Sequence, residues 1–360
     1  MTSKHRQTSF EYAQDKNIPF KKKIFVGLSG GVDSAVSAAL LKRVGADVVG
    51  AFIKTWYPNW LADSCSWRQE RRDAMRVAVN LGIPFVTLDL EREYKREVVD
   101  YMITEYKSGH TPNPDVMCNK EIKFGVFLRK ALAFGADIIA TGHYAQNQIL
   151  STRYQLLAGK DAKKDQSYFL WTLNQAQLSK TILPVGHLLK SEVRNLAKQF
   201  KLPVANKPDS QGICFLGQVD IKQFLSHYVE AKTGDVLDES GKKLGTHDGA
   251  IFYTINQVWR KPYYVVAKNM QSNTISVSTK ANFPTWSPGG QVKLRDINWI
   301  SGTSPDSKKI LAQIRYHGES LPCVISGSTL TFTKSAMVAP GQSVVIYDDD
   351  VCLGGGIIEM

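Results

Sequence analysis

The first 140 residues alternate short apolar segments with amphipathic helical stretches, and this alternation constrains the fold more than any other feature. Strands are predicted at 24–28, 48–53, 85–88 and 138–141, and helices at 34–43, 68–81, 91–107 and 120–134. Gly45 and Gly82 follow the first two helices, where a glycine commonly ends a helix. Strands joined through helices require right-handed crossovers, so we expect a parallel sheet with helices on both faces.

The pattern changes near residue 220. A short helix is predicted at 221–228, followed by turns rich in glycine and lysine from 234 to 249. Short alternating segments then appear at 274–278, 291–294, 309–315, 323–326, 329–333 and 343–347. Turn sequences such as Pro340-Gly341 separate them, which indicates a small antiparallel barrel or sandwich. We therefore expect an extension over 1–20, an α/β domain over 21–219, a small central domain over 220–275 and a β-barrel over 276–360.

The formal net charge of +12 favours a polyanionic partner, either nucleic acid or an acidic membrane surface. The last 60 residues hold four basic and six acidic side chains, so the positive excess belongs to the first 300. No stretch approaches the ~20 apolar residues of a membrane span. Residues 1–20 are polar and lack the apolar centre of a signal peptide, so we expect a mobile extension of a cytoplasmic protein.

The five cysteines are scattered, and no two of them form a C-x-x-C pair. This spacing argues against a secreted disulfide framework, a zinc ribbon and a cysteine-held iron–sulfur cluster. The histidines likewise show no metal-ligand spacing, so no metal site built by the protein alone is expected.

The strongest local signal is the hexapeptide SGGVDS at 29–34, between the first predicted strand and helix. Glycines let backbone amides approach an anion, and a helix N-terminus adds unsatisfied N–H groups and a positive dipole end. The two serine hydroxyls can donate to the same anion, while Asp33 can cap the helix or hold a metal ion. The plainer alternative is a capped turn without a ligand, but this combination of residues favours a phosphate site.

The type of phosphate loop follows from what the hexapeptide lacks. The chain has no Gly-Lys-Ser/Thr triplet of a Walker loop, and Gly27, Gly30 and Gly31 do not fit G-x-G-x-x-G. The second strand ends in Ile53 and Lys54, where a dinucleotide fold would have an acidic residue. The loop resembles the SGGxDS loop of the ATP-pyrophosphatase (PP-loop) enzymes, which transfer AMP to a carbonyl oxygen. That resemblance implies ATP but leaves the acceptor open.

Two cysteines stand in distinctive surroundings. Cys118 follows the rigid segment Thr111-Pro112-Asn113-Pro114-Asp115, and Asn119 is expected to cap the next helix. A cysteine at that helix N-terminus, near lysines, would favour the thiolate, with Asp115 as an acid/base partner. Cys214 lies between two glycines in DSQGICFLG, where it is either a mobile thiol or a core residue. Their separation of 96 residues does not establish that they are neighbours.

Six motifs together resemble the bacterial tRNA-specific 2-thiouridylase (MnmA/TrmU) family, over about residue 22 to the C-terminus: SGGVDS, TPNPDVMCNKEIKFG, ATGHY, KDQSYFL, DSQGICFLG and PGQSVVIYDDDVCLGGGIIE. This family replaces the C2 oxygen of the wobble uridine with sulfur in tRNAs for Lys, Glu and Gln. The resemblance implies a parallel-sheet PP-loop domain of the adenine nucleotide α hydrolase type, a small central domain and a tRNA-contacting β-barrel. The family's Gly-Gln-Arg-Lys-Gly-Leu-type stretch is replaced here by a shorter loop at 256–262.

The resemblance also assigns roles to individual residues. Cys118 would be the nucleophile, Cys214 the persulfide carrier and Asp115 the acid/base, with a transient Cys118–Cys214 disulfide. The target base would meet Asn113, Pro114 and Asp115. ATP would be bound by Gly27, Leu28, Ser29, Gly30, Gly31, Val32, Asp33, Ser34, Ile53 and Gly142. The tRNA would be contacted by His143, Lys164, Asp165, Gln166, Arg315, Tyr316 and Gln342.

The implied partners are ATP, Mg²⁺, tRNA and a persulfide donor, either a cysteine desulfurase or a sulfur-relay protein. Adenylation makes the C2 oxygen a leaving group, and the persulfide supplies sulfur. Cys118 would either release sulfide from the persulfide or act on the adenylated base, and either route leaves a disulfide for a reductant. Two other readings stay open: an amidating PP-loop synthetase acting on a small molecule, and a non-catalytic RNA-binding protein. The first lacks an evident ammonia source, and the intact Asp33, Asp115, Cys118 and Cys214 weigh against the second.

Overall fold

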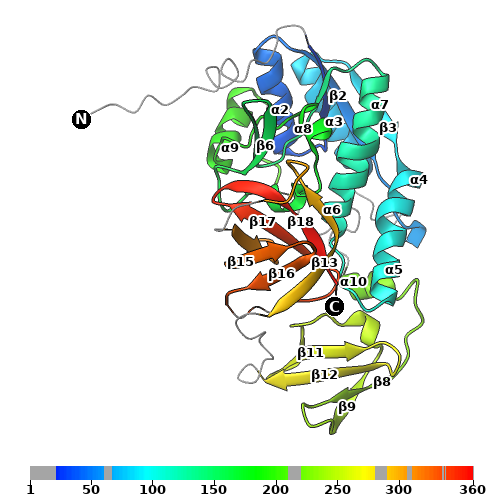
Figure 1. The fold of residues 1–360 in the computed structure, drawn as a ribbon. Helices are drawn as coiled ribbons and strands as arrows, with labels where there is room; N and C mark the ends of the chain where they lie inside the picture. Colours follow the sequence, from blue (N-terminus) through cyan, green and yellow to red (C-terminus); the bar gives the residue numbers. More distant parts are fainter. Residues whose placement is uncertain are drawn as a thin grey trace.

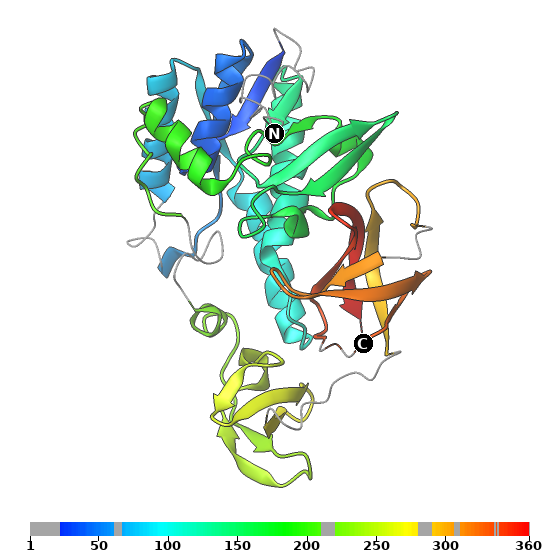
Figure 2. The ribbon, with the colours of Figure 1, turned by 90° about the vertical axis from the view of Figure 1, so that its left-hand side faces the viewer.

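The computed structural model describes residues 22–60, 67–209, 220–279, 290–305, 310–334, 336 and 338–359. Within these ranges the chain forms an N-terminal α/β domain, a C-terminal barrel packed beside it, and a small central β domain that projects away from both (Figure 1, Figure 2). None of the helices in the described ranges is long and apolar enough to cross a bilayer.

The N-terminal domain is built on a parallel sheet in the order β3-β2-β1-β4-β7, as the sequence predicts. Its strands are β1 (Lys23–Gly27), β2 (Asp47–Lys54), β3 (Phe85–Asp89), β4 (Ile138–Ala140) and β7 (Thr181–Ile182). Successive side chains of a strand point to opposite faces, so Ile24 and Val26 pack into one core cluster and Phe25 into another. The sheet is therefore buried on both faces.

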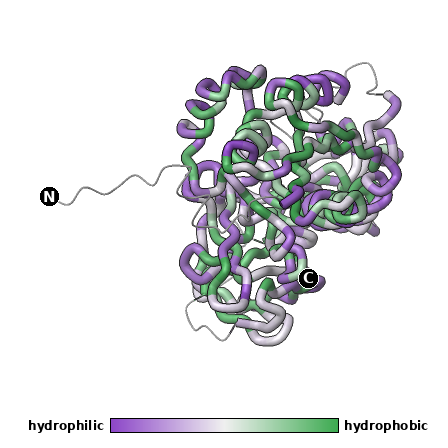
Figure 3. Tube along the Cα trace, turned by 90° about the horizontal axis from the view of Figure 1, so that it is seen from above, coloured by the Kyte–Doolittle hydropathy of each residue, from purple (hydrophilic) through white to green (hydrophobic). Residues whose placement is uncertain are grey.

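Helices cover the two faces of the sheet. One face packs against α2 (Val32–Arg43), α3 (Trp67–Leu81) and α9 (Lys190–Gln199). The other packs against a helical segment from 91 to 107, composed of α4 (Glu91–Tyr94), a π-helical stretch (Lys95–Asp100) and α5 (Tyr101–Lys107). α2 is buried along most of its length, whereas α3 buries one side only. The hydropathy colouring shows hydrophilic and hydrophobic residues mixed along the helical turns of the molecule (Figure 3). The one-sided pattern of α3 is the period from which its position is predicted.

A second long helical segment on this face runs from 114 to 133, as α6 (Pro114–Met117), a π-helical stretch (Cys118–Phe127) and α7 (Leu128–Ala133). The predicted start at 120 is wrong, because Asn113 is the N-cap: its side chain accepts bonds from the amides of Asp115 and Val116 at 3.2 Å each. Pro114 occupies the first helical position, where its missing N–H costs nothing. Asn119 lies inside the helix and is no cap.

The C-terminal barrel has six antiparallel strands and is closed by pairing of β13 with β18. Its strands are β13 (Gln291–Trp299), β14 (Ile310–Gln313), β15 (Ser320–Ser326), β16 (Thr329–Phe332), β17 (Ser343–Asp348) and β18 (Val351–Glu359). A hairpin from the N-terminal domain, β5 (Ala145–Leu150) and β6 (Arg153–Ala158), pairs with β18 and extends the barrel sheet. This hairpin was not predicted, because β5 is mostly polar and lacks a clear alternation.

The central domain is a five-stranded sheet in the order β10-β11-β12-β8-β9. It consists of β8 (Gly234–Leu237), β9 (Lys243–His247), β10 (Val258–Arg260), β11 (Tyr263–Asn269) and β12 (Thr274–Thr279), preceded by α10 (Ile221–Leu225). The segment at 274–278 was predicted to begin the barrel. It instead pairs with β11 and β8, so the central sheet extends to residue 279.

Polar contacts hold the barrel against the N-terminal domain near the start of the 114–133 helix. The amide of Thr111 donates to the Pro340 carbonyl at 2.8 Å, and Arg295 Nη2 lies 2.5 Å from Glu105 Oε2. Deeper in the interface, the Tyr168 hydroxyl donates to the Ser343 carbonyl at 2.9 Å. The loop before Cys118 is therefore fixed by both domains.

Candidate active site

The SGGVDS loop connects β1 to α2, at the carboxyl edge of the parallel sheet. Gly30 has a φ of +76°, and a β-carbon there would collide with the Glu70 carbonyl oxygen, so only glycine fits the turn. Gly31 is the N-cap of α2, and no side chain caps this helix end. The first amides of α2 thus point out of the sheet edge toward the loop, which is the arrangement that binds phosphate.

The two serines of the loop lie side by side. Ser29 Oγ is 3.3 Å from Ser34 Oγ, and the Ser29 amide donates to Ser34 Oγ at 3.2 Å. Ser34 Oγ also lies 3.2 Å from the Gly31 carbonyl. These bonds close the loop on itself, and the hydroxyl groups lie where they can turn toward a phosphate. The plainer expectation that Asp33 or Ser34 caps α2 is wrong.

Asp33 is instead held by two residues that the sequence analysis did not assign. Lys190 Nζ lies 2.7 Å from Asp33 Oδ1 and 2.9 Å from Oδ2, and the Tyr144 hydroxyl donates to Oδ1 at 2.8 Å. Burial and the adjacent Asp33 carboxylate raise the pKa of Tyr144 well above its usual range, so the hydroxyl keeps its proton. Tyr144 belongs to the ATGHY motif, whereas no sequence signal marks Lys190.

Lys190 is shared with a second carboxylate, Asp209. Its Nζ lies 2.9 Å from Asp209 Oδ1, while Arg194 Nη2 lies 2.5 Å from the same oxygen and Lys164 Nζ lies 2.7 Å from Oδ2. Burial opposes ionisation of Asp209, but the hydrogen bonds and charges of Lys164 and Lys190 outweigh it and hold its pKa below the usual range. Asp209 is the first residue of the DSQGICFLG motif.

A second lysine ties the same segment to the loop. Lys207 Nζ donates to the Gly30 carbonyl at 3.1 Å and lies 2.8 Å from Asp73 Oδ2 on α3. Asp73 is itself 8% exposed and accepts a bond from Gln69. Residues 207–209 thus contact the turn of the phosphate loop directly, through Lys207, and its carboxylate only through Lys190, which Asp209 and Asp33 share.

Ile53 and Gly142 lie at the same edge of the sheet. Gly27 pairs with Ala51, so Ile53 is two residues beyond the level at which β1 ends. A β-carbon on Gly142 would lie 2.6 Å from the Ser34 amide nitrogen and 2.8 Å from the Asp33 carbonyl carbon. Gly142 therefore packs directly on the backbone of the phosphate loop, and the ATP-binding roles of Ile53 and Gly142 stay predictions.

This crowding yields a testable expectation. Gly142→Ala should raise the dissociation constant for ATP by about 10- to 100-fold, because the added methyl group displaces the backbone of Asp33 and Ser34. Gly245→Ala in the central domain is the matched control, since a β-carbon there meets only the side chain of Trp259, at 3.1 Å, and not the backbone of the loop. Isothermal titration of both variants with ATP checks it. Equal affinities in the two variants would contradict the steric account.

Cys118 lies in the first turns of the 114–133 helix and is 2% exposed. Asn113 and Asp115 precede it and are half-buried. The helix then passes the end of β1 and the segment 142–144: Lys123 Nζ is 3.4 Å from His143 Nε2, and a β-carbon on Gly27 would lie 3.6 Å from the Phe127 ring. Because His143 stands between Gly142 and Tyr144, three consecutive residues join the cysteine helix to Asp33. The helix that carries Asp115 and Cys118 is thus in contact, through Lys123 and His143, with the segment that packs on the phosphate loop.

His143 was assigned to tRNA contact, yet it is 7% exposed and bonded to Thr141, with Nδ1 2.7 Å from the Thr141 hydroxyl. Burial, with a contribution from Lys123, lowers the pKa of His143 well below its usual range, so the ring is neutral at pH 7. In this structure one ring nitrogen faces Lys123 on the helix of Cys118, and the other faces the Thr141 hydroxyl. Contact with tRNA would require the covering side chains to move.

Three other residues assigned to tRNA, Lys164, Asp165 and Gln166, follow β6 in the chain. Lys164 is partly exposed, while Asp165 accepts bonds from the Gly159 and Ser167 amides at 2.7 and 3.1 Å. The side chain of Gln166 accepts from the Tyr144 amide at 3.0 Å. Of these three, Lys164 is the one whose charge faces outward. Burial outweighs those hydrogen bonds and raises the pKa of Asp165.

Two segments of the barrel complete this region. Tyr316 is 38% exposed, and its ring centroid lies 4.5 Å from that of Phe169, whose carbonyl accepts from Asn119 at 3.1 Å. Arg315 stands next to it and is half-buried. Gln342 follows Gly341, where a β-carbon would lie 2.9 Å from the Thr111 amide nitrogen. The barrel thus brings its assigned residues to the loop that precedes Cys118.

Cys214 and Cys65 lie outside the described residues, and the pairing of Cys214 with Cys118 stays a prediction. The described ends on either side of Cys214 are anchored: Asp209 to the lysines above, and α10 through Trp60. Trp60 stacks on His227 with ring centroids 3.9 Å apart and lies 6.4 Å from Phe224. Cys323 and Cys352 are buried in the barrel, and burial raises the pKa of each thiol.

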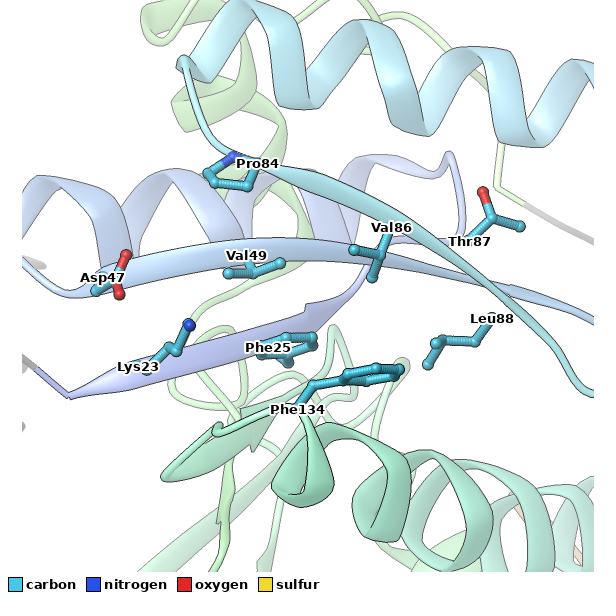
Figure 4. Close-up of a pocket in the computed structure, with 9 residues that line it drawn as sticks. All are labelled: Lys23, Phe25, Asp47, Val49, Pro84, Val86, Thr87, Leu88 and Phe134. Carbon is cyan, nitrogen blue, oxygen red and sulfur yellow. The ribbon is translucent and has the colours of Figure 1, made fainter.

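A cavity of about 630 Å³ lies elsewhere, between the sheet face and α7 (Figure 4). Apolar residues of β1, β2 and β3 line it with the exposed Phe134, and its two charged residues, Lys23 and Asp47, are the first residues of their strands. It therefore begins at the edge of the sheet opposite the phosphate loop. Within the described ranges no group of three or more His, Cys, Asp or Glu side chains is arranged to hold a metal ion.

Comparison with known families covers almost the whole chain. Residues 22–218 match the tRNA methyl transferase HUP domain, 222–279 the tRNA methyl transferase PRC-barrel domain and 290–358 the aminomethyltransferase β-barrel domain. Among solved structures, NMN synthetase from Francisella tularensis covers 56% of this chain and 76% of its own, with a TM-score of 0.35 and 18% identity.

Relatives match more closely over their full length. The tRNA-specific 2-thiouridylase MnmA of Nitrosomonas eutropha is 44% identical over 356 residues, which covers 94% of this chain and 98% of the relative. MnmA 2 of Geobacillus kaustophilus is 42% identical over 356 residues, covering 95% of each. Identity at this level over both whole chains shows that the chain belongs to the tRNA-specific 2-thiouridylase MnmA family.

Proposed function

We propose that this chain is a tRNA-uridine 2-sulfurtransferase that acts on the wobble uridine of tRNAs for Lys, Glu and Gln. The observation that supports it most is the junction of residues 142–144, which connects an ATP-type phosphate loop to the helix of Cys118. This contact would bring adenylation next to the sulfur chemistry. The match to the HUP domain implies ATP binding, and the basic N-terminal part suits a polyanionic substrate in the cytoplasm.

The residues of the phosphate loop are suited to bind a nucleoside triphosphate. The uncapped N-terminus of α2, Gly31 and the paired serines would bind phosphate oxygens, and Gly142 leaves room for close backbone packing beside them. Asp33 is the carboxylate of this loop, so it would hold Mg²⁺ together with the ATP phosphates. When bound, the ion would stabilise the charge of the departing pyrophosphate. Lys190 and Tyr144 position the Asp33 carboxylate.

The sulfur step follows from the same residues. Transfer of AMP to the uracil C2 oxygen releases pyrophosphate, and Asn113 and Asp115 would hold the base beside Cys118, with Asp115 accepting a proton. The terminal sulfur of a Cys214 persulfide then becomes bonded to C2 while AMP leaves with the oxygen. The Cys118 thiolate attacks the inner sulfur, either before this step to release sulfide or after it to release the thiolated base. Both orders leave a Cys118–Cys214 disulfide, which a thiol reductant or relay protein reduces by two electrons.

The test uses purified protein, an unmodified tRNA transcript, Mg²⁺, ATP and a cysteine desulfurase with cysteine as persulfide donor. We expect pyrophosphate release that depends on the tRNA, and one 2-thiouridine per AMP formed. Nucleoside mass spectrometry and a pyrophosphate assay measure the two products in parallel. ATP hydrolysis that is indifferent to tRNA, with no thiolated nucleoside, would exclude the proposed activity.

A further inference from the structure

Four charged side chains form a continuous series of ion pairs between the phosphate loop and the segment assigned to tRNA. Lys164 Nζ is 2.7 Å from Asp209 Oδ2, and Asp209 Oδ1 is 2.9 Å from Lys190 Nζ. Lys190 Nζ in turn lies 2.7 Å from Asp33 Oδ1. One end of the series is a partly exposed lysine, and the other is the carboxylate of the ATP loop.

Lys190 forms ion pairs with two carboxylates at once, those of Asp33 and Asp209. Its side chain is only 15% exposed, so its charge is weakly screened and its contacts with Asp33 and Asp209 compete. Asp209 likewise forms ion pairs with three cations, Lys164, Lys190 and Arg194. Removal of one cation from Asp209 leaves the carboxylate less neutralised, so it attracts the remaining cations more strongly. Each end of the series therefore affects the other.

We propose that Asp209 and Lys190 are positioning residues that couple tRNA binding to ATP binding. A tRNA phosphate withdraws Lys164 from Asp209, Asp209 then draws Lys190 away from Asp33, and Asp33 becomes available to the Mg²⁺–ATP complex. The two states are Lys190 shared by both carboxylates, as in this structure, and Lys190 on Asp209 alone. The inference rests on the proposed function, since it requires that tRNA and ATP are both ligands of this site.

Such coupling is reciprocal, because the two ligands bias the same pair of states. Allosteric coupling of this kind typically changes affinity by about 5- to 150-fold. We therefore expect tRNA to tighten nucleotide binding by about 10-fold, and nucleotide to tighten tRNA binding by the same factor. ATP would then be bound tightly only when the acceptor is present, which limits wasteful hydrolysis.

The experiment titrates the full-length protein with Mg²⁺ and α,β-methylene ATP, with and without an unmodified tRNA transcript. Two variants should shift the affinity without tRNA in opposite directions. Lys164→Met should raise nucleotide affinity to the level of the tRNA-bound wild type, because Asp209 is already free of one cation. Asp209→Asn should lower nucleotide affinity and abolish the effect of tRNA, because Lys190 then stays on Asp33. A purely structural defect would not raise affinity in one variant.

Lys160→Met is the matched control, since Lys160 is a neighbouring exposed lysine that pairs with Glu192 at 3.3 Å and not with Asp209. It should retain the wild-type coupling. Equal nucleotide affinity of the wild type with and without tRNA would overturn the inference, as would a Lys164→Met variant whose affinity is unchanged or lower. If the wild type thiolates tRNA while these affinities do not move, the coupling alone fails. If no thiolation occurs, the proposed function fails.

Discussion

Cys118→Ala is expected to reduce 2-thiouridine formation by about 10³-fold or more, because in both orders of the proposed reaction the Cys118 thiolate releases the transferred sulfur from Cys214. Release of pyrophosphate in the presence of tRNA should continue for a single turnover, because adenylation uses the phosphate loop and not the Cys118 sulfur. Rapid-quench assays that follow AMP and thiolated nucleoside together measure both. The variant therefore separates adenylation from thiolation.

The barrel provides a control of the same chemistry. Cys323 is 3% exposed, against 2% for Cys118, so Cys323→Ala removes an equally buried sulfur at a similar cost in stability. It should thiolate at the wild-type rate. Full thiolation by Cys118→Ala would remove Cys118 from the mechanism, and equal loss in both variants would point to general destabilisation.

The second large effect is expected at Asp33 of the phosphate loop. Asp33→Ala should lower tRNA-dependent pyrophosphate release by about 10²- to 10³-fold, because it removes the carboxylate that would hold Mg²⁺ and leaves Lys190 without its partner in the loop. Thiolation should fall in parallel, while persulfide transfer from the donor to the protein continues. A pyrophosphate assay and labelling with ³⁵S-cysteine distinguish these steps.

Asp47→Ala is suited as the control for this variant. Asp47 is an exposed carboxylate at the start of β2, on the opposite edge of the same sheet. Its removal should leave pyrophosphate release unchanged. Wild-type adenylation by Asp33→Ala would contradict the assignment of the loop as the ATP site.

The sequence was sufficient where a residue type has a local consequence. The apolar period of the first strands and helices determined the parallel sheet, and the glycines of the loop determined its turn. The helix of Cys118 was misplaced because two caps were available: Asn119 looked suitable, but Asn113 precedes a proline that starts the helix. A local pattern could not decide between them without the tertiary contact of Asn119 with Phe169.

What the sequence could not supply were contacts between distant segments. Lys190 lies 157 positions from Asp33, and a lone lysine on a helix is ordinarily a solvated residue. The β5–β6 hairpin depends on β18, because β6 pairs with β18 at Leu156 and Leu157 and with β5 on its other side. The burial of His143 likewise depends on Lys123 and Phe124 from another helix. These features follow from topology rather than from periodicity.

The central claim is that this chain puts sulfur on the wobble uridine. The most direct measurement is nucleoside mass spectrometry of tRNAs for Lys, Glu and Gln from cells that lack this gene and any redundant thiolase. We expect 2-thiouridine derivatives at the wobble position to disappear and to return with the wild-type gene but not with Cys118→Ala. Unchanged 2-thiouridine in the cells that lack the gene would contradict it.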